Sequence, residues 1–166
     1  MSLKIGAKVI YPSQGPCLIG SIVQKEIGGN AVSFYQLELL DESGGELFVP
    51  VERAKASGLR QLMSKADLPK LLDQFKQPVP SAKDWKQRGN DNLKRIASGS
   101  AFDLAEVVES LTELSATKEL SFREGQMLDK ARRLLVSEIA EVISKPKSAA
   151  EELIDQALNA RKMVSV

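Results

Sequence analysis

The 166-residue sequence contains no histidine. Histidine is the side chain whose ordinary pKa lies closest to neutral pH, and it is also the commonest metal ligand. The sequence equally lacks a phosphate-binding loop of the G-x-x-x-x-G-K-[ST] type, a dinucleotide fingerprint and a G-x-S-x-G nucleophile turn. We therefore expect a protein that is not an enzyme and that uses no cofactor and no metal.

Cysteine is almost as scarce, since Cys17 is the single one in the sequence. An intramolecular disulfide is impossible, which fits a reducing compartment. No stretch approaches about 18 consecutive apolar residues, and the N-terminus has no basic segment followed by an apolar run. We expect a cytoplasmic protein that is neither exported nor membrane-spanning.

An excess of charge of either sign is also missing, because 23 Lys and Arg residues face 22 Asp and Glu residues. No overall positive field attracts nucleic acid or an anionic membrane, so any charge-driven contact has to be local. The hydrophobic content of 43% is enough for ordinary cores. The composition indicates a globular chain of one domain or two small ones.

The first 60 or so residues are made of short β-rich runs separated by turn residues. The runs are "AKVIY", "CLIGSIVQKEI", "AVSFYQLELL" and "ELFVPV", and the breaks between them are "PSQGP", "GGN" and "ESGG". This pattern predicts four or five antiparallel strands that form a small barrel or a curled sheet. We assign this first domain to residues 1–61.

From Ser64 onward the hydrophobic period becomes that of helices, and a serine followed three residues later by an acid marks each predicted start. Pro69 places the true start of the first helix nearer Asp67. The pattern predicts five helices in a compact all-α domain over residues 62–166, and hence an α+β fold. The five pairs are Ser64/Asp67, Ser81/Asp84, Ser100/Asp103, Ser121/Glu124 and Ser148/Glu151.

The only tryptophan, Trp85, lies in the polar stretch "SAKDWKQRGNDNLKRIASGS". Five basic residues and two acids lie between Lys83 and Arg95, a local charge of +3 in a nearly neutral chain. A helix over residues 82–97 puts Leu93, Ile96 and Gly89 on one face with Trp85 and Asn92 at its edge. The ring either packs in the first helical turn, with the cations solvated, or wedges at a base step while the cations bind phosphates.

Four segments of the chain, quoted at the end of this paragraph, together resemble the CarD family (CarD/CdnL) of bacterial transcription regulators. The resemblance runs from about Lys4 to Ile143. It implies a Tudor-like N-terminal domain that binds the β subunit of RNA polymerase, similar to the polymerase-interacting domain of the transcription-repair coupling factor. It also implies a helical domain that contacts promoter DNA. The segments are "IGAKVIYPSQG", "FVPVERAKASGLR", "DWKQRGNDNLKRIASGSAFDLAEVVESL" and "LSFREGQMLDKARRLLVSEIA".

The resemblance also implies roles for particular residues. Trp85 matches the family's tryptophan, which inserts in the minor groove by the −10 element, at the upstream edge of the transcription bubble, and slows bubble collapse. The predicted DNA-binding residues are Trp85, Lys86, Arg88, Asn92 and Arg95, of which Lys86 and Arg88 match the family's basic neighbours. The predicted polymerase-binding residues are Lys25, Phe48, Val49 and Pro50.

Two functions stay open at this point. The first is a monomeric transcription regulator that binds polymerase, stabilises the promoter open complex and is associated with the nucleoid through polymerase. The second is a protein-protein interaction module that docks on polymerase or another protein without touching DNA, with Trp85 as a protein contact or a core residue. Lys25 could equally be solvated and Val49 could belong to the core.

Overall fold

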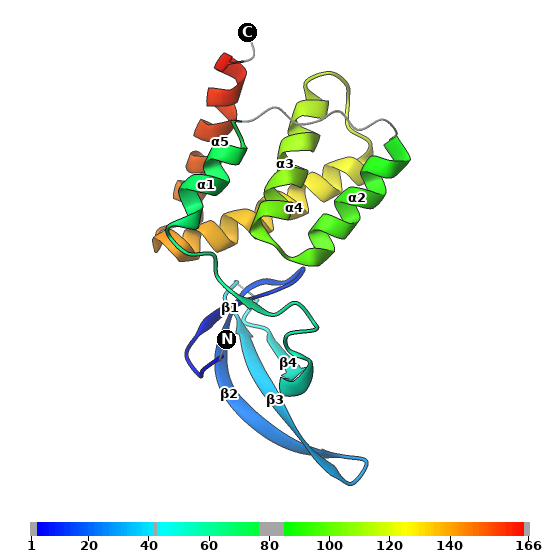
Figure 1. Cartoon of the computed structure of the whole chain (residues 1–166), viewed down its shortest axis with the longest axis vertical. Coiled ribbons are helices and arrows are strands. Elements are labelled where there is room, and N and C mark those ends of the chain that lie inside the picture. Colours follow the sequence, from blue (N-terminus) through cyan, green and yellow to red (C-terminus); the bar gives the residue numbers. More distant parts are fainter. Residues whose placement is uncertain (1–2, 42, 77–84, 165–166) are drawn as a thin grey trace. The chain divides into compact units, whose positions relative to one another are not determined.

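The chain folds into two compact units, Met1–Leu62 and Met63–Val166. The computed structural model, drawn in Figure 1, describes residues 3–41, 43–76 and 85–164, and for residues 85–88 and 161–164 it describes the backbone only. The first unit is built from strands and the second from helices. The predicted α+β fold, with the strands first and the helices second, is confirmed.

The first unit is a five-stranded antiparallel sheet in the order β4-β3-β2-β1-β5. Gly28 and Gly29, both with positive φ, form the tight turn between the two longest strands, as the "GGN" break predicts. β4 and β5 lie at opposite edges, so the sheet is open and the small barrel does not close. The strands are β1 (Lys8–Tyr11), β2 (Gly15–Ile27), β3 (Asn30–Leu39), β4 (Glu46–Pro50) and β5 (Arg60–Gln61).

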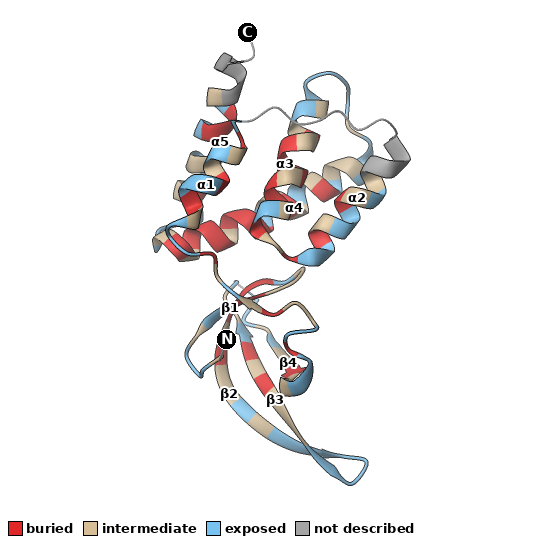
Figure 2. Cartoon of the chain, viewed as in Figure 1, coloured by how far each residue is buried: buried red, intermediate tan, exposed pale blue. Residues whose placement is uncertain are grey.

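One face of this sheet carries the core of the first unit. Along β3, Tyr35 and Leu37 are buried, whereas Glu38 is exposed and Gln36 is half-buried, as strand alternation requires. Figure 2 shows the buried positions gathered in the sheet away from the tip of the β2–β3 hairpin. The core is formed by Val9, Cys17, Ile19, Tyr35, Leu37, Val49, Ala54 and Leu59.

The second unit contains five helices within the described residues, as predicted. α4 is the central one: it packs against α3 and α5 and also contacts α2, which lies on α3. Large side chains that are almost fully buried, among them Phe75, Leu111, Leu135, Ile139 and Ile154, form the core of this unit. The helices are α1 (Asp67–Gln74), α2 (Trp85–Ser98), α3 (Ala101–Ser115), α4 (Phe122–Ile143) and α5 (Lys147–Val164).

Helix starts follow the predicted serine signals at two of the five places. Ser100 and Ser121 are the N-caps of α3 and α4, and each serine side chain accepts the backbone N–H three residues later. α1 begins at Asp67, as Pro69 indicated, although Ser64 still accepts the Asp67 N–H at 3.2 Å.

The remaining two signals have different outcomes. The Ser148 signal is wrong as a cap, because α5 already begins at Lys147, directly after Pro146. Ser148 therefore lies inside the first turn. The Ser81/Asp84 pair lies outside the described residues.

Candidate functional site

The outer face of the sheet presents an aromatic and basic surface. Phe48 on β4 is 44% exposed, and the Lys25 Nζ lies 4.3 Å from the centroid of its ring. The same Nζ lies 6.0 Å from the ring of Phe34 on β3. A cation over an exposed aromatic ring contributes about 0.5–1 kcal/mol. We call Lys25, Phe34 and Phe48 the sheet surface.

The pairing of the strands explains why these three side chains share a face. Phe48 lies opposite Gln36, and Lys25 lies opposite Val32. Gln36, Phe34 and Val32 alternate along β3 with the buried Tyr35 and Leu37, so they and their partners point away from the core. The long β2 strand carries Lys25 within reach of Phe48 although β3 lies between them.

Two further residues predicted to bind polymerase have different positions. Val49 is 4% exposed and packs in the core, because it follows Phe48 directly and therefore points to the opposite face. Its side chain supports the sheet surface from below and is not part of it. Pro50 is half-buried and lies opposite Phe34, next to the sheet surface.

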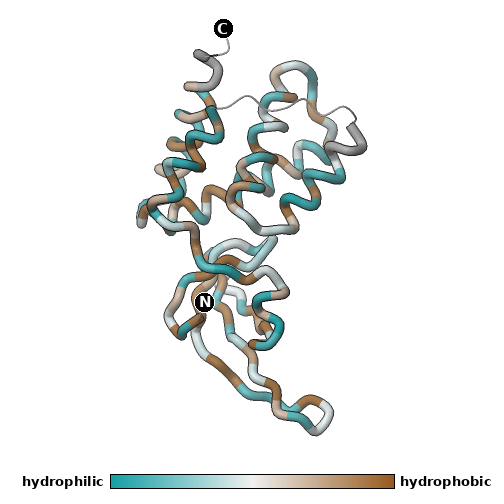
Figure 3. Tube along the Cα trace, viewed as in Figure 1, coloured by the Kyte–Doolittle hydropathy of each residue, from teal (hydrophilic) through white to brown (hydrophobic). Residues whose placement is uncertain are grey.

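The second candidate surface is formed by α2, which begins at Trp85. The side chains of Trp85, Lys86 and Arg88 lie outside the described residues. Figure 3 shows that the described part of α2 is mostly hydrophilic. Of the residues predicted to bind DNA, the structure therefore describes the side chains of Asn92 and Arg95.

Asn92 and Arg95 are tied into the packing of α2 on α3. Arg95 Nη1 donates to Asn92 Oδ1 at 3.2 Å, and Arg95 Nη2 lies 3.2 Å from Glu106 Oε1. Asn92 is 3% exposed, so it cannot reach DNA from this position, and the contact predicted for it is corrected to a role in holding Arg95. Arg95 keeps 30% of its side chain exposed and has five N–H donors, so it can still reach a phosphate.

The buried side of α2 differs from the predicted one. Ile96 is 6% exposed, as expected for the core face, but Leu93 is 41% exposed. Asn92 occupies the buried position instead. Asn92 is tolerated there because its side-chain oxygen accepts the hydrogen bond from Arg95.

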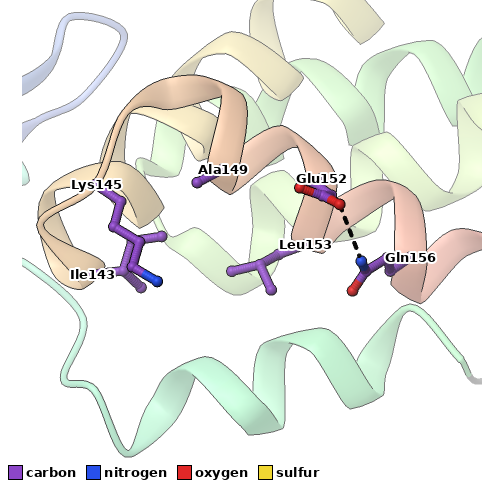
Figure 4. Close-up of a pocket in the computed structure, with 6 residues that line it drawn as sticks. All are labelled: Ile143, Lys145, Ala149, Glu152, Leu153 and Gln156. Carbon is purple, nitrogen blue, oxygen red and sulfur yellow. Dashed lines mark hydrogen bonds between the residues drawn. The ribbon is translucent and has the colours of Figure 1, made fainter.

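A cavity of about 210 Å³ lies at the α4–α5 turn, where Ile143, Ala149 and Leu153 provide apolar lining. Figure 4 shows its polar rim, on which Gln156 donates to Glu152 at 3.4 Å. This volume is below the roughly 300–1,000 Å³ of most ligand pockets. Within the described ranges, no group of three or more potential ligand residues is placed to hold a metal ion.

Comparison with protein families assigns both units. Residues 3–63, which include the sheet surface, match the CarD-like/TRCF RID domain, and residues 70–155, which include α2, match the C-terminal domain of CarD. The chain belongs to the CarD family. A curated relative, "Putative transcription factor YdeB" of Bacillus subtilis (strain 168), is 29% identical over 137 residues, which cover 82% of this chain and 89% of that protein.

Membership of the CarD family makes this chain a transcription regulator whose N-terminal unit is of the RNA polymerase-interacting type. The two candidate surfaces fall in different matched domains, the sheet surface in the first and α2 in the second. The part of this CarD-family chain that the structure describes contains no helix long and apolar enough to cross a membrane.

One exposed residue of the CarD C-terminal domain was not predicted from the sequence. Phe122, at the start of α4, is 83% exposed, the highest value among the large hydrophobic residues of the described chain. Its neighbour Arg123 is also exposed. The serine signal at Ser121 located this helix start, but no sequence pattern indicated that the aromatic ring next to the cap would face solvent.

Proposed function

We propose that this protein binds the β subunit of RNA polymerase through the sheet surface and stabilises the promoter open complex through α2. In this proposal α2 contacts DNA in the minor groove at the upstream edge of the −10 element. The protein acts as a monomer at the nucleoid. The observation that carries the proposal is the presence in one chain of both CarD-type domains, each with its own candidate surface.

The sheet surface supports the polymerase half of the proposal. Exposed aromatic residues are typical of residues that contribute strongly to protein interfaces. Phe48 has this character, because its ring is 44% exposed and already carries the Lys25 ammonium group. Lys25 and Phe48 together thereby present a positive charge and an aromatic ring to a partner.

The polymerase half is tested by Phe48→Ala. Truncation of the ring removes apolar contact area and the support of Lys25, so we expect a loss of affinity for the isolated β-subunit domain of at least about tenfold. Titration calorimetry measures it. Ile5→Ala is the matched control, because Ile5 is 61% exposed in the same unit but is not part of the sheet surface. Equal affinities for Phe48→Ala and Ile5→Ala would contradict this half of the proposal.

The basic character of the α2 segment supports the DNA half. Its local charge of +3 comes from Lys83, Lys86, Arg88, Lys94 and Arg95 against two acids, and Glu106, which pairs with Arg95, offsets part of it. A patch of this size gives weak, salt-sensitive binding to free DNA. Attachment to polymerase raises the local concentration of α2 at the promoter and makes weak contacts sufficient.

The DNA half is tested by Trp85→Ala. Loss of the indole ring removes the wedge at the bubble edge, so we expect a shorter open-complex lifetime and unchanged polymerase affinity. Competitor challenge of preformed complexes measures the lifetime, and Trp85→Phe, which keeps an aromatic ring, is expected to lie between Trp85→Ala and the wild type. An unaltered lifetime for Trp85→Ala would rule out the wedge.

A thermal melt separates the wedge from a core role for Trp85. Truncation of a buried tryptophan costs about 3–5 kcal/mol, whereas truncation of a surface ring costs much less. If Trp85→Ala destabilises the helical unit by the larger amount, its effect on the lifetime is a folding effect. The proposal expects a melting temperature close to that of the wild type.

The exposed Phe122 favours a second candidate function, in which the helical unit docks on another protein. Phe122 is 83% exposed, and phenylalanine is one of the residue types enriched at protein interfaces. A photocrosslinker at position 85 distinguishes the two functions. Transfer to promoter DNA agrees with the wedge, whereas transfer to protein alone agrees with the docking module.

A further inference from the structure

The connection between the two units is short. The chain passes from one unit to the other between Leu62 and Met63. The last strand of the sheet unit, β5, ends at Gln61, which pairs with Val9 on β1. The first helix of the second unit, α1, begins at Asp67. Residues 62–66 therefore connect the last paired strand residue to the first helix.

A buried carboxyl group on α4 holds the start of the helical unit. Glu138 is 1% exposed, and its Oε2 accepts a hydrogen bond of 2.8 Å from the backbone N–H of Met63. Both residues belong to the helical unit, although 75 positions separate them in the sequence. The Met63 side chain is itself 9% exposed. The first residue of the helical unit is thus held at its backbone and at its side chain.

The chemistry of Glu138 indicates that packing alone does not explain its place. Its neighbours on α4, Leu135 and Ile139, are fully buried hydrocarbon side chains. Burial of a polar group is unfavourable unless the group is hydrogen-bonded, so a leucine here would fill the space at lower cost. The carboxyl group provides an acceptor for a backbone N–H that no strand or helix of the described chain satisfies.

We propose that Glu138 is a positioning residue: by holding Met63 it leaves Leu62 as the one residue of the connection that is free to pivot between Gln61 and Met63. The inference rests on the proposed function, because it concerns how effectively polymerase binding brings α2 to promoter DNA. A longer connection dilutes a tethered group, and the effective concentration falls roughly as the −3/2 power of the tether length. Glu138 itself touches neither polymerase nor DNA.

Insertion of Gly-Ser-Gly-Ser after Leu62 tests the inference without disturbing the buried bond. The pivoting segment grows from one residue to five, so the power law gives a decrease in effective concentration of up to about tenfold. We expect the protein concentration that gives half-maximal open-complex stabilisation to rise by up to about tenfold. Affinity for the isolated β-subunit domain stays unchanged, because the sheet surface is untouched.

Two substitutions of Glu138 test the anchor itself. Glu138→Ala removes the acceptor, and we expect the Met63 amide to exchange its hydrogen at least about tenfold faster. The half-maximal concentration should also rise, in the same direction as for the insertion. Glu138→Gln keeps an oxygen that accepts the Met63 N–H, so it should restore both the slow exchange and the wild-type transcription activity.

The outcomes separate this inference from the proposed function. If the insertion leaves the half-maximal concentration unchanged while Trp85→Ala shortens the open-complex lifetime, the positioning role is overturned and the proposed function stands. Unchanged exchange of the Met63 amide in Glu138→Ala also overturns it. If the insertion leaves the half-maximal concentration unchanged and Trp85→Ala leaves the lifetime unchanged, the positioning role and the wedge are both overturned. Should Glu138→Ala fail to fold, the insertion decides the question alone.

Discussion

Cys17 shows how the sheet core controls the chemistry of a single residue. It lies on β2 with no exposed surface, and its Sγ is 3.5 Å from the Gly15 carbonyl oxygen, which accepts its weak hydrogen bond. Removal of the thiol from water disfavours the thiolate and raises its pKa from 9.0 to about 11. The only cysteine of the chain is therefore an inert part of the core.

We predict that Cys17 in the folded protein resists thiol reagents at pH 8. A rise of about two units in the pKa lowers the thiolate fraction at pH 8 by about a hundredfold, and burial of the thiol slows the reaction further. A colorimetric disulfide exchange assay measures the rate. The same assay in denaturant serves as the control, and the thiol should then react at the rate of an ordinary cysteine. Rapid labelling of the native protein would show that the sheet opens more readily than this packing indicates.

At the scale of one element, the start of α4 is held by a reciprocal pair of hydrogen bonds. Ser121 Oγ accepts the Glu124 N–H at 3.1 Å, and Glu124 Oε1 accepts the Ser121 N–H at 3.0 Å. The Ser121 backbone hydrogen bond lowers the pKa of Glu124 below its ordinary 4.5, and Lys118, 3.6 Å away, acts in the same direction. Because α4 packs against three other helices, its first turn helps to hold the whole unit.

We predict that Glu124→Gln makes the stability of the helical unit less dependent on pH. The folded pKa of Glu124 lies below its unfolded value, so the ionised group stabilises the fold above about pH 4.5 and loses this contribution as the pH falls through the folded pKa. Urea unfolding of the wild type and of Glu124→Gln at about pH 7 and about pH 3 measures the difference in stability. Glu124→Gln should lower the free energy of unfolding by less than about 1 kcal/mol at about pH 7 and should leave it unchanged at about pH 3.

A wild type and a Glu124→Gln variant that differ equally at both pH values would contradict this assignment. The difference would then come from the shape of the side chain and not from its charge. Ser121→Ala serves as the control. This substitution removes the hydroxyl group that accepts the Glu124 N–H, and it should lower the free energy of unfolding by about 0.5–2 kcal/mol at either pH.

At the scale of the whole molecule, each unit has its own core. The sheet unit spans 62 residues and the helical unit 104, Met63 to Val166. A domain of about 60 residues buries a smaller share of its surface than a larger one and is correspondingly less stable. The sheet unit should therefore be the less stable of the two.

We predict that the helical unit folds without the sheet unit but loses its effect on transcription. A fragment of residues 62–166, which retains the Met63 N–H, should melt cooperatively, as circular dichroism measures. Addition of this fragment together with residues 1–62 should not restore open-complex stabilisation at concentrations where the intact chain is active, because the tether is missing. Full activity of the mixed fragments would mean that the connection contributes nothing.

Much of the fold could be predicted from local patterns. The β-rich runs and the turn residues between them predicted the strands of the first unit, and the serine signals located the starts of α3 and α4 at Ser100 and Ser121. These features depend on the periods of a strand and a helix and on hydrogen bonds three residues apart. The candidate site was harder to predict, since Val49 and Asn92 were chosen as surface contacts and are buried.

The sequence by itself determined the division into a strand half and a helical half, because hydrophobic period and turn residues are local properties. Only the tertiary structure decided that the sheet stays open, that Lys25 lies over Phe48, that Leu93 faces out while Asn92 faces in, and that Glu138 reaches Met63. Each of these depends on which surfaces pack together across many residues. A short-range sequence pattern does not specify which distant surfaces pack together.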